Sequence, residues 1–241
     1  MTALIGTVAD SDIDSRRQVA AACRIISRHG HEDLTLGHVS VRGEGGRSVW
    51  IKRKGVTLGE ACVEDVIRAE LDDDLPQGRY MHLEAVMHSE AYRTRPDINA
   101  VIHTHPWYAT ALGAAGAGLE VLSHDGVLFK DGVGLYDNTS GLITTLEAAG
   151  AVIDALGSRR AVLMRHHGVL IVGEDIRWAT LAAITLERAI KLQSLVSTLG
   201  TPMPIDPEAV EGLFAEKYRH QFLDEYWDAW CRELEAGGFR T

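Results

Sequence analysis

Cysteine is scarce in this chain of 241 residues: the three present, Cys23, Cys62 and Cys231, are widely separated and form no Cys-x-x-Cys pair. An odd number at this spacing indicates neither a disulfide framework nor the ligand set of a zinc finger. We therefore expect reduced thiols, as in a reducing cytosol. Hydrophobic residues make up 46% of the chain, which is enough to build a substantial core.

Long apolar runs and an excess of positive charge are also missing. No apolar stretch approaches the ~20 residues that a membrane-spanning helix needs. The N-terminal MTALIGTVADSDID lacks the basic start and apolar centre of a signal peptide. The formal charge of −10 disfavours nucleic acid or an anionic membrane as the main partner, although a local basic pocket can still bind a small anion. We expect a cytoplasmic protein that acts on a small anionic molecule.

No repeat, low-complexity tract or linker divides the sequence, so we expect one domain over residues 1–241, with helices around a central sheet. Apolar periodicity and capping residues predict helices over 14–30, 83–94, 140–156 and 174–199, and a helical tail at about 207–236. Alternation predicts strands in 34–42, 48–55, 98–105 and 160–173, with short strands near 119–123 and 127–134. Residues 62–70 suggest a short helix or turn.

The stretch NAVIHTHPWY, residues 99–108, ends an apolar strand with two histidines and a proline. Residues i and i+2 of a strand point to the same face, so His103 and His105 present two imidazoles side by side. Two imidazoles on one face can hold one divalent ion. Taken alone, however, a His-x-His pair is more often structural or incidental than metal-binding.

Two further segments carry polar groups that can meet this pair. RHHG follows the apolar AVLM, so a ring at the end of a second strand can converge on the same point. HLEAVMH opens a helix and offers Glu84 as a general acid or base, with His88 one helical turn away on the same side. Taken alone, Glu84 is better explained as a carboxylate that stabilises a helix N-terminus, and both interpretations stay open at this point.

In combination, GHVSVR, HLEAVMH, YRTRPDINAVIHTHPWYATAL and AVLMRHHGVLIVGE resemble the class II aldolase/adducin-head family over about residues 14–200. The resemblance implies an α/β/α three-layer sandwich on a largely antiparallel sheet, assembled as a tetramer with active sites at subunit interfaces. It implies that His103, His105 and His167 hold a divalent metal and that Glu84 is the catalytic acid/base. The family's metal position directly precedes the glycine, which selects His167 over His166.

The sequence departs from the sugar-phosphate aldolases of that family in the three segments that bind phosphate there. GHVS replaces G-N-x-S, KRKG replaces T-P-S-G, and HLE replaces a Ser-Ser pair before the glutamate. Imidazoles and long cations suit a flatter anion, such as a carboxylate on a ring, better than a phosphate. The candidates for substrate binding are His38, Ser40, Lys52, Lys54 and Gly55, and His82 is a second candidate for proton donation. Alternation places Lys52 and Lys54 on one face, although KRKG is also explained as a solvated strand end.

These departures resemble a branch of decarboxylases that act on hydroxylated aromatic or pyridine carboxylates, such as dihydroxyphthalate. We therefore expect a metal-dependent carbon–carbon lyase that decarboxylates such an acid. Zinc is the expected ion, and manganese, cobalt or iron are alternatives. An aldolase or epimerase acting on a sugar or sugar acid is the main alternative function. A non-catalytic adducin-like module is a third, which the complete set of histidines and glutamate disfavours.

Some other segments have simple structural explanations, and the role of a few residues stays open. His29 and His31 surround Gly30 at a predicted helix end, where cations suit the helix dipole. LGAAGAGL, residues 112–119, lacks the G-x-G-x-x-G order of a nucleotide-binding loop. The sequence leaves open whether the site includes the loop residue His124, the neighbouring His166, or the tail residues Tyr218, Tyr226 and Trp227.

Overall fold

Seven strands form one sheet in this computed structural model, which describes residues 10–71 and 80–239. The order across the sheet is β3-β2-β1-β4-β7-β6-β5, and all neighbouring strands run antiparallel except β5 and β6. The strands are β1 (His38–Arg42), β2 (Ser48–Lys52), β3 (Val66–Glu70), β4 (Ala100–Thr104), β5 (Gly134–Tyr136), β6 (Ala161–Met164) and β7 (Gly168–Gly173). Residues 1–9, which carry most of the expectation of no signal peptide, lie outside the described residues.

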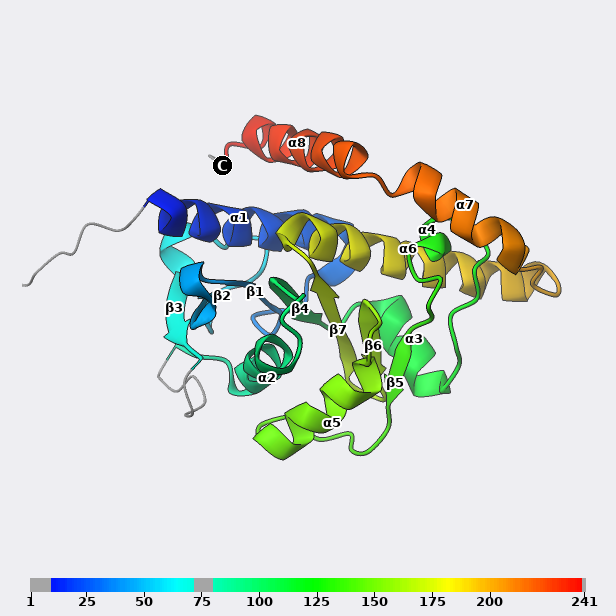
Figure 1. The fold of residues 1–241 in the computed structure, drawn as a ribbon, viewed down its shortest axis with the longest axis horizontal. Coiled ribbons are helices and arrows are strands. Elements are labelled where there is room, and N and C mark those ends of the chain that lie inside the picture. The colour runs from blue at the N-terminus through cyan, green and yellow to red at the C-terminus, as the bar shows by residue number, and fades with distance from the viewer. Residues whose placement is uncertain (1–9, 72–79, 240–241) are drawn as a thin grey trace, which may run out of the picture.

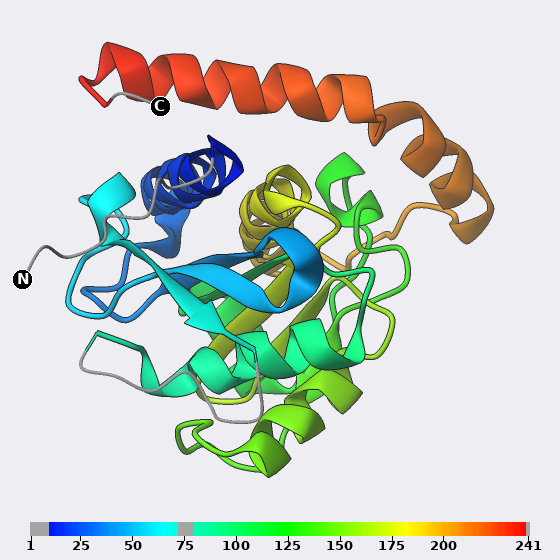
Figure 2. The ribbon, with the colours of Figure 1, turned by 60° about the vertical axis from the view of Figure 1, so that its left-hand side comes forward.

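Helices cover both faces of this sheet (Figure 1). One face carries α1 (Asp10–Ile26), α3 (Trp107–Ala115) and α6 (Ile176–Leu199), and the other carries α2 (Val86–Thr94) and α5 (Leu146–Leu156). The other helical segments are η1 (Ser27–His31), η2 (Glu44–Gly46), η3 (Val63–Asp65), η4 (Leu83–Ala85), α4 (His124–Val127), α7 (Pro207–Lys217) and α8 (His220–Ala236). Helix α8 crosses the outer side of α1 and α6 (Figure 2). The predicted α/β/α sandwich is confirmed.

Strand β4 shows how alternation divides the interior into two cores. Ile102 packs in the core under α1 and α6, whereas Val101 packs in the core under α2 and α5. Because side chains two residues apart share a face, His103 follows Val101 and Thr104 follows Ile102. The imidazole of His103 therefore lies on the α2 side of the sheet, near the C-terminal end of β4. No helix in the described part of the chain combines the length and apolar character needed to cross a membrane.

The predictions between β4 and β6 were the least accurate. No strand forms at 119–123, because Gln193 of α6 accepts a hydrogen bond from the Glu120 amide and donates one to the Gly118 carbonyl. These bonds replace those that a neighbouring strand would make. The strand predicted at 127–134 is also wrong: α4 and turns occupy most of it, and β5 begins only at Gly134.

Three further boundaries differ from the sequence-based expectation. Residues 62–70 contain a turn followed by a real strand, β3, which pairs with β2 at the sheet edge. Helix α5 begins after Thr145, whose side chain caps it by accepting a hydrogen bond from the Ala148 amide, so the helix starts later than the expected residue 140. The tail at 207–236 is two helices, interrupted between Lys217 and His220.

Buried His31 gives the first testable prediction. Its Nδ1 lies 2.8 Å from Thr104 Oγ1, and its Nε2 donates to the Ala183 carbonyl oxygen at 3.1 Å. Burial lowers the pKa of His31 to about 4 from 6.5. Between these two pH values, His31 is therefore protonated in the unfolded chain but not in the folded protein. The contribution of His31 to the unfolding free energy is fully present above pH 6.5. It falls by up to about 1.4 kcal/mol per pH unit as the pH drops toward 4.

We expect His31→Gln to flatten this part of the stability profile, whatever its effect on stability at neutral pH. The free energy of unfolding of metal-free protein, measured in urea across this pH range, gives the slope directly. The other buried histidines keep a residual slope in both proteins. Parallel profiles for the variant and the wild type would contradict the role given to His31.

Candidate metal centre

Four side chains converge on one point at the end of β4. Glu84, His103, His105 and His167 each offer a ligand atom, and these atoms all lie within 4.8 Å of one another. The Nε2 atoms of His103 and His105 are 3.1 Å apart. The carboxylate of Glu84 lies 3.7 Å from His103 Nε2 and 3.4 Å from His167 Nε2. The three histidines expected as ligands and the expected catalytic glutamate therefore form one cluster.

The turn between β6 and β7 brings the third histidine into this cluster. His166 adopts a left-handed conformation, with φ of 61°, and is exposed, whereas the next residue, His167, belongs to the cluster. A Cβ atom on Gly168 would lie 2.4 Å from the His105 ring and 2.5 Å from the Thr104 carbonyl oxygen. Only glycine fits there, because β7 passes so close to the end of β4. The His-Gly order thus has a steric cause.

Hydrogen bonds at the far side of two rings fit them for metal binding. His103 Nδ1 donates to the Val169 carbonyl oxygen at 3.0 Å, and His105 Nδ1 lies 2.6 Å from Asp33 Oδ2. Protons held at Nδ1 leave both Nε2 lone pairs free toward the cluster. Burial lowers the pKa of His103 to about 4, so its ring is neutral, as a ligand must be. Three imidazoles and a carboxylate suit zinc and other first-row divalent ions.

Asp33 is a functional candidate that the sequence did not reveal. Its carboxylate orients His105 from a loop 72 residues earlier in the chain. We expect Asp33→Asn to weaken divalent-metal affinity by about 10- to 100-fold, because the amide still accepts the hydrogen bond but lacks the charge that strengthens the ligand. Competition with a chromogenic chelator measures this. The adjacent Glu32→Gln is a matched control that should keep wild-type affinity, and equal affinity in both variants would contradict the role of Asp33.

Glu84 sits in η4, just before α2, and is largely buried. Its Oε1 accepts a hydrogen bond of 2.8 Å from the Ile143 amide. Burial alone would raise the pKa of Glu84, but the adjacent imidazoles of His103 and His167 and the Ile143 amide outweigh this effect and hold that pKa well below its usual range. The carboxylate is therefore ionised at rest, so it is ready to accept a proton or to contact a cation.

Behind the metal cluster lies a buried row of polar side chains. His38 on β1 pairs with His103 in the sheet register, and their ring centroids are 5.0 Å apart. His38 Nδ1 lies 2.7 Å from His88 Nε2, and Ser40 Oγ lies 2.6 Å from His88 Nδ1 and 2.8 Å from the Tyr92 hydroxyl. Ser40 is thus engaged with α2 at rest, whereas His38 lies beside the metal cluster.

The KRKG segment does not gather its residues at one place. Lys52 is fully buried, on the side of the sheet that faces α1, and its Nζ donates to the Val56 and Arg53 carbonyl oxygens. Burial lowers the pKa of Lys52. Lys54 and Gly55 are exposed on the turn that follows β2, where Gly55 has a positive φ of 84°. Of the two lysines, only Lys54 presents its side chain to solvent.

The tail residues pack on their own chain in this structure. The Tyr218 hydroxyl donates to the His124 carbonyl oxygen, and Trp227 is buried in the core beneath α8. Tyr226 remains partly exposed and lines a cavity of about 320 Å³ between α6 and α8. Neither His124 nor these aromatic residues belong to the metal cluster.

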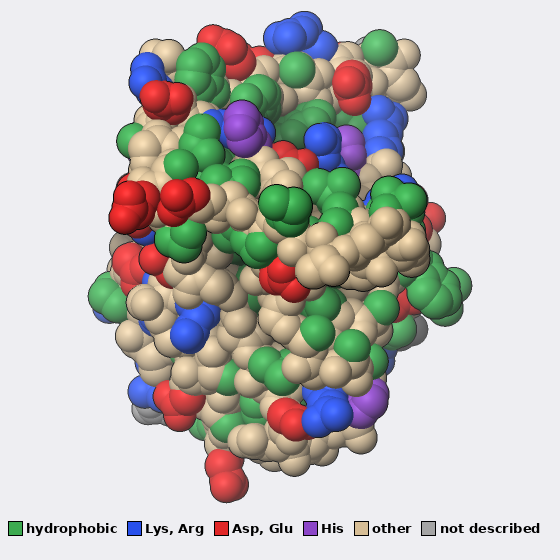
Figure 3. Space-filling view, turned by 90° about the vertical axis from the view of Figure 1, so that its right-hand side faces the viewer, with side chains coloured by type: hydrophobic (Ala, Val, Ile, Leu, Met, Phe, Trp, Pro, Cys, Tyr) green, Lys and Arg blue, Asp and Glu red, His purple; other side chains and the backbone are tan. Residues whose placement is uncertain are grey.

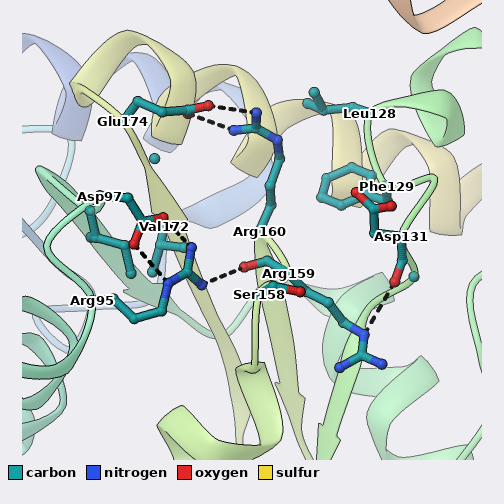
Figure 4. A pocket seen from close by; sticks show the side chains of 13 residues that line it. Arg95, Asp97, Leu128, Phe129, Asp131, Ser158, Arg159, Arg160, Val172 and Glu174 are labelled. Carbon is teal, nitrogen blue, oxygen red and sulfur yellow. Dashed lines mark hydrogen bonds and ion pairs between the residues drawn. The ribbon is translucent and has the colours of Figure 1, made fainter. Parts of the chain in front are cut away.

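A second cavity, of about 160 Å³, lies at the opposite end of the central strands from the metal cluster (Figure 4). Arg160 forms a two-fold hydrogen-bonded pair with Glu174, and Arg95 pairs with Asp97 and donates to the Gly157 carbonyl oxygen. These pairs cancel much of the charge around the cavity.

Comparisons with known proteins agree with this geometry. The family model of the Class II Aldolase and Adducin N-terminal domain matches residues 17–194, and the chain belongs to this family. It is 30% identical to a 3,4-dihydroxyphthalate decarboxylase of Arthrobacter keyseri, over 81% of this chain and 84% of that protein. It is 28% identical to a 5-deoxy-D-ribulose 1-phosphate aldolase of Bacillus thuringiensis, over 84% of this chain and 94% of that protein.

A solved structure confirms the fold over the full chain. The L-fuculose 1-phosphate aldolase of Glaciozyma antarctica superposes with a TM-score of 0.83 and 24% sequence identity, covering 100% of this chain and 97% of that one. At this identity the likeness establishes the architecture. The choice between the chemistries of the relatives depends on the site itself.

Proposed function

We propose that this protein is a divalent-metal-dependent carbon–carbon lyase that decarboxylates a hydroxylated aromatic or related dicarboxylic acid. The observation that carries the proposal is the cluster of Glu84, His103, His105 and His167 around one point. Relatives named as 3,4-dihydroxyphthalate decarboxylases, from Arthrobacter keyseri and Rhodococcus jostii, are each 30% identical to the chain and support the decarboxylase branch. The imidazoles that replace phosphate-binding hydroxyls support it further.

The bound ion would act as a Lewis acid that binds neighbouring substrate oxygens and stabilises the negative charge left when carbon dioxide departs. His103, His105 and His167 would hold it, and we expect zinc ahead of manganese, cobalt or iron. Asp33 and the Val169 carbonyl would keep two of these rings in the orientation that ligation requires.

Glu84 would move the proton. Because its carboxylate is ionised at rest, it can take the proton from a substrate hydroxyl beside the scissile bond. The carbon–carbon bond then breaks, its electron pair stays on the ring carbon, and carbon dioxide leaves. Glu84 returns the proton to that carbon, and the phenolate regains a proton from water after release. His82 would need to gain a proton at Nε2 before it could serve as the donor instead.

Other residues expected at the substrate remain part of the proposal. Lys54 and Gly55 are exposed on the turn after β2, where they can contact a second carboxylate. Lys52 and Ser40 are engaged with neighbouring groups at rest, so they would act from behind the residues that touch substrate. His38 would make a direct contact because its ring lies next to His103.

An aldolase acting on a sugar or sugar acid is the second candidate, favoured by the sequence likeness to the 5-deoxy-D-ribulose 1-phosphate aldolase. Both reactions break a carbon–carbon bond and leave an electron pair that needs stabilisation, so the same cluster serves either. Carbon dioxide release from 3,4-dihydroxyphthalate and aldehyde release from L-fuculose 1-phosphate, measured on one zinc-loaded preparation, separate the two. Release of carbon dioxide alone supports the proposal, and release of aldehyde alone overturns it.

We also propose that the chain assembles as a homotetramer with its sites at subunit interfaces. Exposed apolar side chains flank the site residues in sequence: Leu34, Leu83, Leu142 and Trp107, the last with 85% of its surface exposed. In Figure 3 hydrophobic side chains are scattered over the face that is drawn, among polar and charged ones. Light scattering after size-exclusion chromatography gives the subunit count, and a monomer at micromolar concentration would contradict this expectation.

A further inference from the structure

Three histidines crowd together beside the metal cluster without belonging to it. The ring centroid of His38 lies 4.5 Å from that of His82 and 4.7 Å from that of His88. Within the described residues these rings do not form a second metal-binding group. His38 and His88 share a hydrogen bond between two ring nitrogens, so one nitrogen of that pair must be bare and accept while the other donates. Each neutral ring has one N–H and one bare nitrogen, and the hydrogen-bond partners determine which is which.

In the row of hydrogen bonds that ends at His38, each group donates to the next one. Within the described part of the chain, the Tyr92 hydroxyl contacts Ser40 Oγ and the Val101 backbone N–H, so it receives from the amide and donates to Ser40. Ser40 then donates to His88 Nδ1, which leaves the His88 proton on Nε2. His88 donates from Nε2 to His38 Nδ1. The proton of His38 is therefore on Nε2, and this ring offers a donor.

His82 has the opposite polarity. Its ring hydrogen-bonds to the Arg53 backbone, where only the carbonyl oxygen can pair with it because the amide already donates to Asp65. Its Nε2 is buried without a partner, so Nδ1 is the atom that donates. Nε2 therefore carries a bare lone pair in a side chain that is only 7% exposed. A buried acceptor without a partner is costly, and a ligand that supplies a proton would satisfy it.

We infer that His38 and His82 form a subsite for an un-ionised hydroxyl group of the substrate, whose O–H donates to His82 Nε2 while its oxygen accepts from His38 Nε2–H. The inference rests on the proposed function, because it places this hydroxyl beside the cluster that would hold the reacting end of the substrate. Tyr92, Ser40 and His88 are positioning residues in this scheme, since they fix the donor end of His38 and touch no substrate.

The subsite would distinguish ligands by whether the bound oxygen carries a proton, more than by their size. A phosphate dianion carries no proton for His82, so its oxygen would face the lone pair of that ring. A phenol or alcohol satisfies both rings at once. The replacement of small hydroxyls and an amide by these two imidazoles therefore selects unphosphorylated substrates that keep a free hydroxyl.

Two probes that differ by one hydroxyl test the subsite directly. 2-Hydroxybenzoate has the adjacent hydroxyl and carboxylate expected to face the metal, and 2,3-dihydroxybenzoate adds one neighbouring hydroxyl. Calorimetry on zinc-loaded wild-type protein should show about tenfold tighter binding of the dihydroxy compound. His82→Phe keeps an aromatic ring but removes the lone pair, and it should bind both probes with affinities within about twofold. Ser40→Ala, which breaks the row leading to His38, should reduce the preference while leaving His82 intact.

The outcomes separate this inference from the proposed function. An undiminished preference in His82→Phe overturns the subsite, whether or not carbon dioxide is released from 3,4-dihydroxyphthalate. Loss of the preference in His82→Phe supports the subsite, even if the wild type fails the decarboxylation assay. Should His82→Phe not fold, long-range 1H–15N spectra of wild-type protein labelled at histidine give the same answer. A proton at His82 Nδ1 and at His38 Nε2 supports the subsite, and either proton on the other nitrogen overturns it.

Discussion

Replacement of His167 by alanine is expected to remove bound zinc and reduce carbon dioxide release to background. In the proposed metal centre this side chain is one of three imidazole ligands, so its loss should weaken metal affinity by more than the roughly 100-fold that the loss of a supporting hydrogen bond can cost. Metal analysis of protein purified in excess zinc, together with turnover on 3,4-dihydroxyphthalate, measures both effects.

His166→Ala is a matched control for this experiment. The two histidines are adjacent, but His166 is exposed and lies outside the cluster. Its replacement should leave zinc content unchanged. Zinc loss in the His166 variant, with retention in the His167 variant, would reverse the assignment and remove the structural basis of the proposed lyase.

Replacement of Glu84 by glutamine is expected to lower turnover by about 10²- to 10⁴-fold while zinc stays bound. The amide oxygen can still accept the hydrogen bond from the Ile143 amide, so the local structure should persist. It cannot take up and return a proton at neutral pH. The three imidazoles remain to hold the ion, which separates this variant from the histidine variants.

The control for Glu84 addresses its other explanation, a carboxylate that stabilises a helix N-terminus. Glu147 occupies the first turn of α5 and is exposed. Glu147→Gln should cost a similar small amount of helix stability and leave turnover unchanged. A Glu84→Gln protein with wild-type turnover would exclude Glu84 from proton transfer.

The pairing of His103 and His105 was predictable because its signal is local. His103 and His105 share a strand, and the strand period alone puts both rings at its end. Glu84 and His167 required the family resemblance, since no spacing within the chain says that a helix turn and a distant hairpin meet β4. The left-handed conformation of His166, and the contact of Gly168 with His105, explain afterwards why the second histidine of the pair is the one that points inward.

The remaining features depend on contacts that sequence patterns do not encode. Asp33 has no local signature, because its role arises only when its loop reaches His105. His31 was expected to cap a helix, yet it is buried against Thr104 and α6. The segment at 119–123 has the composition of a strand, but side-chain hydrogen bonds from Gln193 take the place of a neighbouring strand. In each case tertiary contacts overrode local preference.

The cluster draws its groups from three separate stretches of chain, around residues 84, 103–105 and 167, and a fourth stretch, around residue 33, orients the ring of His105. An unfolded chain cannot gather them, so the native state would bind the ion far more tightly than the unfolded chain. Saturation at a thousandfold excess over the dissociation constant would then add about 4 kcal/mol to the unfolding free energy. The melting temperature would rise with ion concentration. A core substitution far from the cluster would lower the apparent metal affinity if it loosened the contact between β4 and β7.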